Sequence, residues 1–340
     1  MTTSRKKQIC LEETPYYHCI SRCVRRAFLC GKDQYTGRSY EHRRAWVVDL
    51  LKHLSEVFAI DICAYAVLHN HSHIVFRVDR EKALAWSGDE VIAQWTSLYK
   101  PSPIVERHLD GFNLTTAEKK VVAEDIEKWR HRLYDISWFM RYLNETIARR
   151  ANEEDKCTGR FWEGRFKSQA LLDDAALLTC MSYVDLNPIR TGIADTPENS
   201  DFTSIQERIR HYQKNLTLKE HRHEAQILSP NGLLSFVGGE HQIKGLGISF
   251  SLPDYFELID WAGRAIREDK SGAIPTELAP ILERLNIDPE AWLDSVQTFT
   301  KNYYLVVGTR EASKEYSLAL GRKWFCMTRS SQQLYGSVPA

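Results

Sequence analysis

Three histidines, His69, His71 and His73, follow one another closely between two apolar runs rich in valine, isoleucine and aromatic residues. Such runs are typical of strands, and side chains in a strand point alternately to opposite faces. His71 and His73 should therefore share one face and lie about 7 Å apart along the strand. Two imidazoles on one rigid strand would form half of a site for a divalent metal ion.

The apolar runs on either side of the histidines indicate buried strands. A histidine pair without partners would carry a desolvation cost there. The alternative to a metal site is a pair of structural histidines whose ring nitrogens find hydrogen-bond partners within the core. The spacing of two histidines does not by itself decide between these interpretations.

The histidine segment is one of four motifs that follow one another along the chain. The four blocks are YHCISR at 17–22, YAVLHNHSH at 65–73, GRFWEGRFKS at 159–168 and YVDLNPIRTG at 183–192. Together they resemble the motifs of the HUH single-strand nucleases, and in particular those of the single-tyrosine transposases, which include the REP-associated tyrosine transposases of bacteria. In the histidine motif, Leu68 replaces a methionine of that family, His69 a proline and Ser72 an apolar residue.

The resemblance implies an α+β fold, with a ferredoxin-like HUH nuclease core whose antiparallel sheet carries the histidines on a central strand. The apolar patterns along the chain agree with such a core. The expected strands are 16–24, 60–67, 71–78 and 161–171, and the expected helices are 43–58, 137–152 and 173–186.

Changes in composition along the chain predict its domain organisation. The transposase-like HUH domain is expected over residues 1–196, the extent to which the family motifs reach. Within it, residues 80–130 are polar and helix-prone and are broken by two prolines, so they indicate an insertion. Residues 197–214 are expected to form a linker, and residues 215–340 a mostly helical accessory domain.

The resemblance also implies a metal centre. In HUH transposases two histidines and a third polar group hold Mg²⁺ or Mn²⁺, and the implied histidines here are His71 and His73. The third ligand stays open: Asn144 and Asn152 share one helical stripe, so either could reach the metal. His69 could instead supply a third imidazole, which would shift the preference towards Zn²⁺ or Mn²⁺.

The family's nucleophile is a tyrosine on a helix, which attacks the scissile phosphate and leaves a 5′-phosphotyrosine and a free 3′-OH. Counting back from Gly159 places this tyrosine at Ile147, which has no nucleophilic atom. If the count is right, the Ile147 side chain should face the histidine pair. Tyr142 lies about 140° around the same helix and is the candidate catalytic residue, with Tyr134 further back. Tyr183 is interpreted as a fold position.

Contacts with nucleic acid would have to come from local charge, since the 45 lysines and arginines balance the 45 acidic residues. Cations track phosphates, and aromatic faces can stack on unpaired bases. The basic cluster in the block 159–168 alternates with aromatic residues, which could equally be core residues beneath a solvated basic surface. The residues expected to bind DNA are Arg22, Arg25, Arg26, Arg160, Arg165 and Lys167.

Cysteine usage and hydropathy predict a cytoplasmic protein. The eight cysteines form no pair spaced as Cys-x-x-Cys, which favours free thiols in a reducing compartment. No secretory signal opens the chain and no apolar run is long enough to span a membrane. The expected partner is single-stranded or hairpin DNA. Related enzymes occur as dimers and as monomers, so a homodimer is one expected state.

The expected function is metal-dependent strand cleavage and transesterification in DNA transposition. Because the family's tyrosine position falls on Ile147, two alternatives stay open. One is a domesticated, catalytically impaired relative that binds DNA without the tyrosine link. The other is a nuclease that uses water in place of the tyrosine.

Overall fold

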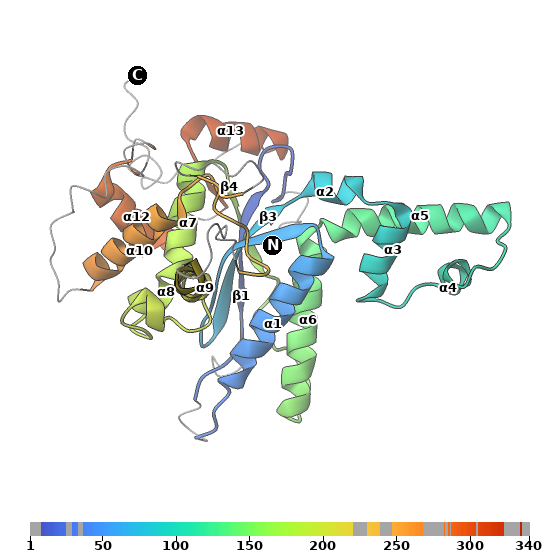
Figure 1. Cartoon of the computed structure of the whole chain (residues 1–340), viewed down its shortest axis with the longest axis horizontal. Coiled ribbons are helices and arrows are strands. Elements are labelled where there is room, and N and C mark those ends of the chain that lie inside the picture. The colour runs from blue at the N-terminus through green and yellow to red at the C-terminus, as the bar shows by residue number, and fades with distance from the viewer. Residues whose placement is uncertain are drawn as a thin grey trace.

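A sheet with helices packed around it organises the molecule (Figure 1). It has five strands, in the order β2-β3-β1-β4-β5. The central strand β1 pairs antiparallel with both β3 and β4, and only β5 is parallel to its neighbour. The expected α+β class is thereby confirmed. The strands are β1 (Tyr16–Arg22), β2 (Ile60–Val67), β3 (His71–Val78), β4 (Lys167–Leu171) and β5 (Val306–Val307).

The structure is a computed structural model. It describes residues 8–24, 29–32, 37–219, 230–238, 247–267, 282, 285, 287–303, 305–322 and 334. Within these residues, none of the helices combines the length and the apolar character that a membrane span would need. The cysteines in the same part of the chain are free thiols, as expected.

The register of the strands fixes which side chains share a face. Paired residues of an antiparallel ladder point to the same side, and neighbours along a strand point to opposite sides. Ile20 pairs with His73 and Cys19 pairs with Ile74. The two pairs therefore lie on opposite faces of the sheet, and His18 joins the face of His73 because it stands two residues before Ile20.

Helices α1 (His42–Val57) and α6 (Ile136–Glu154) cover the face of Cys19, which we call the α6 face. The Phe139 ring of α6 packs edge-on against Phe76 of β3, with ring centroids 4.9 Å apart. Further along α6, the Asn144 amide donates a hydrogen bond of 3.0 Å to the Ser21 hydroxyl of β1. One apolar and one polar contact thus fix α6 along the sheet.

The opposite side, which we call the α7 face, is covered by helices from the C-terminal half of the chain (Figure 1). Helix α7 packs on β2, β3 and β4, and α12 packs on α7. Between these helices and the sheet lies a second apolar core that includes Val75 and Phe299. The helices are α7 (Asp174–Asp185), α8 (Asn187–Arg190), α9 (Ser204–Lys219), α10 (Leu252–Ile266) and α12 (Pro289–Asn302), with the 3-10 turn η2 (Pro197–Asn199) before α9.

The C-terminal elements are built onto the same sheet. Strand β5 extends the sheet beyond β4. In α13 (Arg310–Ala319), the Tyr316 hydroxyl donates a hydrogen bond of 2.7 Å to the Gln8 carbonyl oxygen. In the expected linker, Ser204 and Arg208 are buried. The division into a domain 1–196, a linker 197–214 and a region 215–340 stays a prediction about how the chain folds.

The expected insertion forms a helical arm that projects away from the sheet (Figure 1). Reciprocal hydrogen bonds start two of its helices, between Ser87 and Glu90 and between Thr115 and Glu118. Such capping boxes satisfy the free N–H groups of a first turn. The arm consists of α2 (Arg80–Ala85), α3 (Gly88–Thr96), α4 (Pro103–Leu109) and α5 (Thr116–Leu133).

A buried carboxyl ties the helices of the α7 face together. Asp185, at the end of α7, accepts hydrogen bonds from the Ser204 hydroxyl at 2.5 Å, the Ile205 amide at 3.0 Å and the Tyr255 hydroxyl at 2.7 Å. Burial raises the pKa of Asp185 to about 6, although these bonds and Arg208 favour its ionised form. Desolvation is the larger effect here.

This raised pKa predicts a pH dependence of stability. The folded chain keeps the Asp185 proton up to about pH 6, whereas a free carboxyl releases it near 3.8. The stability from this group is therefore fully present below pH 3.8, and about 3 kcal/mol is lost as pH rises through 6. Asp185→Asn does not titrate, so its free energy of unfolding relative to the unmodified chain should rise between about pH 4 and 6 and then level off. Urea titrations at several pH values measure this difference; a difference independent of pH would contradict it.

Candidate functional site

His71 and His73 lie together on the α7 face at the end of the sheet where β3 begins. Their ring centroids are 4.8 Å apart and the ring planes meet at 77°. His73 is 2% exposed and His71 is half-buried. The two side chains therefore point to the same face of the sheet, as the alternation along the strand predicts. Both rings are at least partly enclosed by other residues.

A chain of hydrogen bonds holds His73 from behind. The Gln169 amide nitrogen on β4 donates to the carbonyl oxygen of Tyr303, which turns the Gln169 amide oxygen towards His18. His18 Nδ1 lies 2.6 Å from this oxygen, and its Nε2 lies 2.9 Å from His73 Nδ1. Three strands therefore contribute to one polar chain in an otherwise apolar layer.

The direction of this chain assigns the ring protons. A carbonyl oxygen only accepts, so His18 Nδ1 carries the proton and His18 Nε2 accepts. His73 Nδ1 must then donate to His18, which leaves His73 Nε2 with a bare lone pair. His71 has the same tautomer, because its Nδ1 faces the Asn70 amide oxygen at 2.5 Å. Both histidines thus present an unprotonated Nε2, the form in which imidazole binds metals.

The electrostatics of the site keep these imidazoles neutral. Burial lowers the pKa of His18 and of His71 to about 4 and that of His73 well below its ordinary 6.5. Arg190 lowers the pKa of both His71 and His73 further, and Arg22 acts on His71. At neutral pH no proton competes for the Nε2 lone pairs.

Tyr183, for which the sequence predicts only a structural role, lies beside the histidines. The ring of Tyr183, on α7, is 5.3 Å from the His73 ring between centroids. Its hydroxyl donates to the Thr300 hydroxyl at 3.4 Å and accepts from Arg190 Nη2 at 3.3 Å. Burial raises the pKa of Tyr183, and the Arg190 guanidinium opposes that shift. A phenol oxygen next to a cation is a group that can develop negative charge.

Asn187 completes the group one helical turn after Tyr183. It is fully buried, and its Nδ2 lies 3.3 Å from His73 Nε2. Its amide oxygen finds no hydrogen-bond partner in the part of the chain that the structure describes. A buried amide oxygen without a partner is costly, and an amide oxygen is a ligand type that divalent metals accept.

Helix α12 covers this group of side chains. The Phe299 ring stacks on Tyr183 at 5.2 Å and contacts the edge of His18 at 5.9 Å. Tyr183 is 2% exposed as a result. The side chains are assembled, but α12 lies between them and solvent.

The candidates on α6 lie on the other face of the sheet. Tyr142 packs edge-on against Tyr99 of the arm at 5.4 Å, and Asn152 donates to the Gly159 carbonyl oxygen at 3.2 Å. Ile147 is 1% exposed in the core of the α6 face and does not face the histidines. The structure therefore does not bring Tyr142 or Asn152 to His71 and His73.

His69 lies in the turn before β3. Its Nε2 is 3.9 Å from Glu41 at the start of α1, and its ring lies against Gly31, where a Cβ atom would come within 2.7 Å of it. Across the described ranges, no cluster of three or more histidine, cysteine and acidic side chains has metal-binding geometry. His69 is therefore placed as a partner of α1 and not as a third imidazole.

Two of the residues expected to bind DNA lie close to the histidines. Lys167, Ile20 and His73 form one row across β4, β1 and β3, and Arg22 stands opposite His71 in the next row on the same face. Lys167 and Arg22 are exposed on the α7 face. With adjacent strands about 4.8 Å apart, both cations lie within reach of a phosphate near the histidines.

The remaining basic candidates are in the loop before β4 or outside the described residues. Arg160 and Arg165 are exposed, and Arg160 donates to the Glu163 carbonyl oxygen at 3.4 Å. Phe161 and Phe166 of the same loop are buried, so these aromatics are core residues. Arg25 and Arg26 lie outside the described residues.

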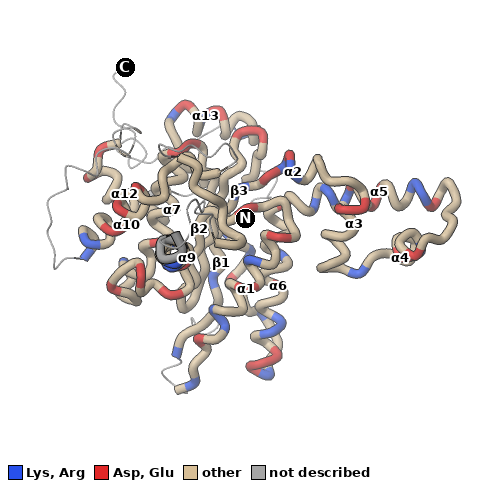
Figure 2. The backbone as a smooth tube through the Cα atoms, viewed as in Figure 1, with Lys and Arg blue, Asp and Glu red and all other residues tan. Residues whose placement is uncertain are grey.

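The distribution of charged residues along the backbone does not indicate one large basic surface. Figure 2 shows basic and acidic residues interspersed along most helices, in agreement with equal numbers of each. Nucleic-acid contacts would therefore depend on local groups of cations and not on the net charge of the chain.

Comparison with known proteins was made on sequence and on structure. No protein family model matches the chain, and no curated protein matches it. A solved structure of a REP-associated tyrosine transposase bound to a REP hairpin is similar, with 11% identity and a TM-score of 0.36. The match covers 73% of this chain and 100% of the other. A likeness of this degree assigns no function.

Proposed function

We propose that this chain is a transposase-like enzyme of the HUH type that cuts and rejoins single-stranded or hairpin DNA. The observation that carries the proposal is the group formed by His71, His73, Tyr183 and Asn187 on one face of the sheet. These are the residue types that metal-assisted attack of tyrosine on a phosphate requires.

The topology supports a ferredoxin-like core. Strands β1 to β4 with helices α1 and α6 follow the order strand, helix, two strands, helix, strand, and pair as β2-β3-β1-β4. This is the split β-α-β arrangement, with both helices on the α6 face. The histidines are then on β3, one of the two inner strands of this four-stranded core, and the resemblance of the motifs implies a position on a central strand.

Mg²⁺ or Mn²⁺ is the proposed cofactor, and the residues that would hold it are His71, His73 and Asn187. Two neutral Nε2 atoms and one amide oxygen without a partner among the described residues fit such an ion. When bound, the metal would polarise the phosphoryl oxygens. His18 and Asn70 act behind the histidines and keep the rings in the required tautomer.

Tyr183 is the proposed nucleophile, in place of Tyr142 on the opposite face. Its phenol oxygen forms a bond to the phosphorus while the bond from phosphorus to the 3′ oxygen breaks, and the phenol proton ends on that 3′ oxygen. Arg190, which donates to the Tyr183 hydroxyl, stabilises the charge that develops there. The covalent phosphotyrosine keeps the bond energy for rejoining.

The proposed reaction requires α12 to move. Phe299 and Thr300 occupy the space around the Tyr183 ring and hydroxyl, so a phosphate gains access only when this helix is displaced. The same burial favours a second function, a DNA-binding relative in which α12 stays in place and no tyrosine link forms. A homodimer and a cytoplasmic location stay predictions.

The metal site is tested by Mn²⁺ binding, followed by electron paramagnetic resonance. We expect His71→Ala to abolish binding, because one of two imidazoles is removed. His18→Phe keeps the ring packing but removes the acceptor for His73 Nδ1, and should weaken binding about 10- to 100-fold. His69→Ala is the matched control and should leave the affinity unchanged. If His69→Ala alone weakened binding, the ion would be near α1.

The nucleophile is tested with an end-labelled hairpin DNA carrying a single-stranded extension, in Mn²⁺. A covalent protein–DNA adduct that survives denaturation is expected, and mass spectrometry should locate it on Tyr183. Tyr183→Phe should abolish the adduct while retaining DNA binding, because only the phenol oxygen is removed. Tyr142→Phe is the matched control and should behave like the unmodified chain. Phe299→Ala should increase the adduct, since it removes the ring that covers Tyr183.

Two outcomes of this experiment decide against the enzyme. Cleavage without an adduct, unchanged in Tyr183→Phe, would establish the nuclease that uses water. DNA binding with no cleavage by the unmodified chain or by Phe299→Ala would establish the DNA-binding relative.

The DNA-binding face is tested by the dependence of affinity on salt. Arg22→Ala combined with Lys167→Ala should weaken binding of single-stranded DNA, because two cations near the histidines are removed. The slope of log K against log salt should fall by about 0.7 for each phosphate that the protein no longer neutralises. Lys119→Ala combined with Lys120→Ala, on the exposed side of the arm, is the control and should leave the slope unchanged. Equal slopes for both double variants would place the strand elsewhere.

A further inference from the structure

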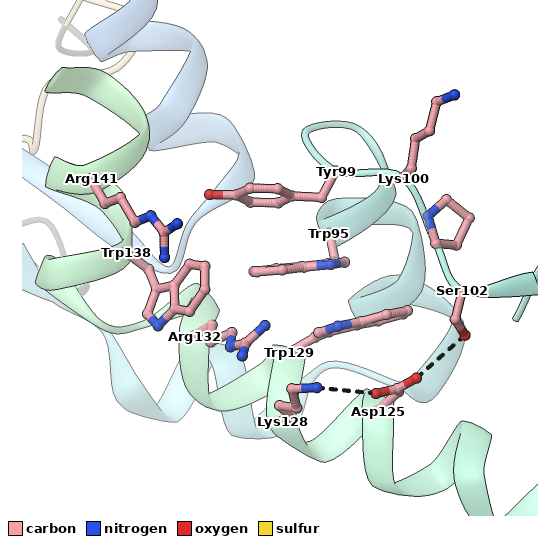
Figure 3. A pocket seen from close by; sticks show the side chains of 11 residues that line it. Trp95, Tyr99, Lys100, Ser102, Asp125, Lys128, Trp129, Arg132, Trp138 and Arg141 are labelled. Carbon is pink, nitrogen blue, oxygen red and sulfur yellow. Dashed lines mark hydrogen bonds and ion pairs between the residues drawn. The ribbon is translucent and has the colours of Figure 1, made fainter. Parts of the chain in front are cut away.

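A second candidate site lies far from the histidines, at the root of the arm. A cavity of about 440 Å³ opens between α3, α5 and the first turns of α6 (Figure 3). The cavity is near the end of the sheet where β3 ends, because the arm begins there with α2. The arm also returns to this end of the sheet: the Ala59 amide, just before β2, donates to the carbonyl oxygen of Leu133 at the end of α5. His71 is at the other end of β3, which is roughly 23 Å long.

Stacked aromatic rings form one wall of this cavity (Figure 3). Trp95 lies between Tyr99 and Trp129, with ring centroids 4.3 and 5.8 Å away and interplanar angles of 20° and 10°. Trp138 meets Trp95 edge-on at 5.5 Å. Trp95 and Trp129 are buried and serve as the core of the arm, whereas Tyr99 and Trp138 are half-exposed.

The second property of the cavity is its positive charge. Arg132 Cζ lies 4.0 Å from the Trp138 ring centroid and 5.3 Å from that of Trp95. Among the described residues, neither Arg132 nor Lys100 forms an ion pair with a carboxylate, although both line the cavity. The other two cations are paired, Lys128 with Asp125 and Arg141 with Glu145. Asp125 is the one acidic residue in the lining.

This combination is more than an apolar cluster requires. Aromatic rings that only pack against one another do not require unpaired cations beside them. Two such cations next to half-exposed rings favour binding of a ligand that carries an anion on a flat, apolar group. A nucleotide has both parts: a base that stacks on aromatic side chains and a phosphate that binds lysine or arginine. The volume is in the range of small-molecule sites.

We propose that this cavity is a second binding site for single-stranded DNA and takes one or two nucleotides of the strand at a distance from the cut. Stacking against Tyr99 and Trp138 would hold the bases, and Arg132 and Lys100 the phosphates. The arm would then act as an anchor for the strand, on the opposite side of the sheet from Tyr183. The proposal concerns binding and does not depend on cleavage.

The first test is photocrosslinking of the full chain to a short single strand of bromodeoxyuridine, with the crosslinked peptides located by mass spectrometry. We expect crosslinks to Tyr99 or Trp138 in addition to any at β1 and β4. Crosslinks confined to β1 and β4 would overturn the second site and leave the proposed function intact. Crosslinks confined to the arm would support the second site and contradict DNA binding near the histidines.

The second test compares affinities of a labelled oligo-dT by fluorescence anisotropy. Tyr99→Leu should raise the Kd about tenfold, because one stacking ring is removed. The matched control is Phe112→Leu at the exposed tip of the arm, which should bind like the unmodified chain. Lys100→Glu should lower the salt slope, and the matched Lys120→Glu should not. Because Lys100 is exposed, it can be changed without disturbing the core. Equal effects of the two variants within each matched pair would contradict the proposal.

A strand and a free nucleotide share the chemistry of this site, so thymidine monophosphate is used as a competitor. Displacement of oligo-dT from the arm only at a large excess of the monophosphate supports a strand site. Displacement at equal concentrations would show that the cavity selects a free nucleotide and would overturn the anchor.

Discussion

The hydrogen-bond chain from Gln169 through His18 to His73 is the constraint on which the rest of the site depends. It runs across β4, β1 and β3, and each link needs the register that these strands have. A slip of one residue on any of the three strands would turn one of these side chains to the α6 face. The apolar layers on both faces of the sheet therefore specify the tautomer of His73 by specifying the register.

The dry surroundings of this chain have two consequences. They keep the imidazoles neutral, which leaves the Nε2 atoms of His71 and His73 available to a ligand, and they make an unpaired polar atom costly. The Asn187 amide oxygen, which has no partner among the described residues, is such an atom, and the nitrogen of the same amide lies 3.3 Å from His73 Nε2. This oxygen supports the proposed metal site, which α12 covers.

Local patterns predicted much of this architecture. The strand alternation placed His71 and His73 on one face, and the expected helix 43–58 corresponds to α1 at His42–Val57. The expected strand 161–171 was too long, because its first part is a loop: the Val24 amide bonds to the Phe161 carbonyl there, and regular pairing starts at Lys167. Such boundaries depend on contacts with distant strands that no local pattern contains.

The position of Tyr142, the candidate nucleophile, relative to the histidines could not be predicted from the sequence for a related reason. The spacing of Tyr183 and Asn187 puts both on one helix face, and this signal was present in the sequence. Which of two helices covers the histidine face depends on the crossover connections, which a count along the chain does not reveal. Tyr142 and Tyr183 lie on opposite sides of the sheet, since α6 packs on one side of β1 and α7 on the other.

The hydrogen bonds fix His18, His71 and His73 as neutral rings protonated on Nδ1. Nitrogen-15 NMR of the labelled imidazoles at neutral pH measures this directly, since protonated and bare ring nitrogens have well separated shifts. We predict bare Nε2 signals for all three rings, and a shift of the His73 pattern in Gln169→Leu, which removes the acceptor that orients the chain. Protons on Nε2 of His71 and His73, or positively charged rings, would contradict the account.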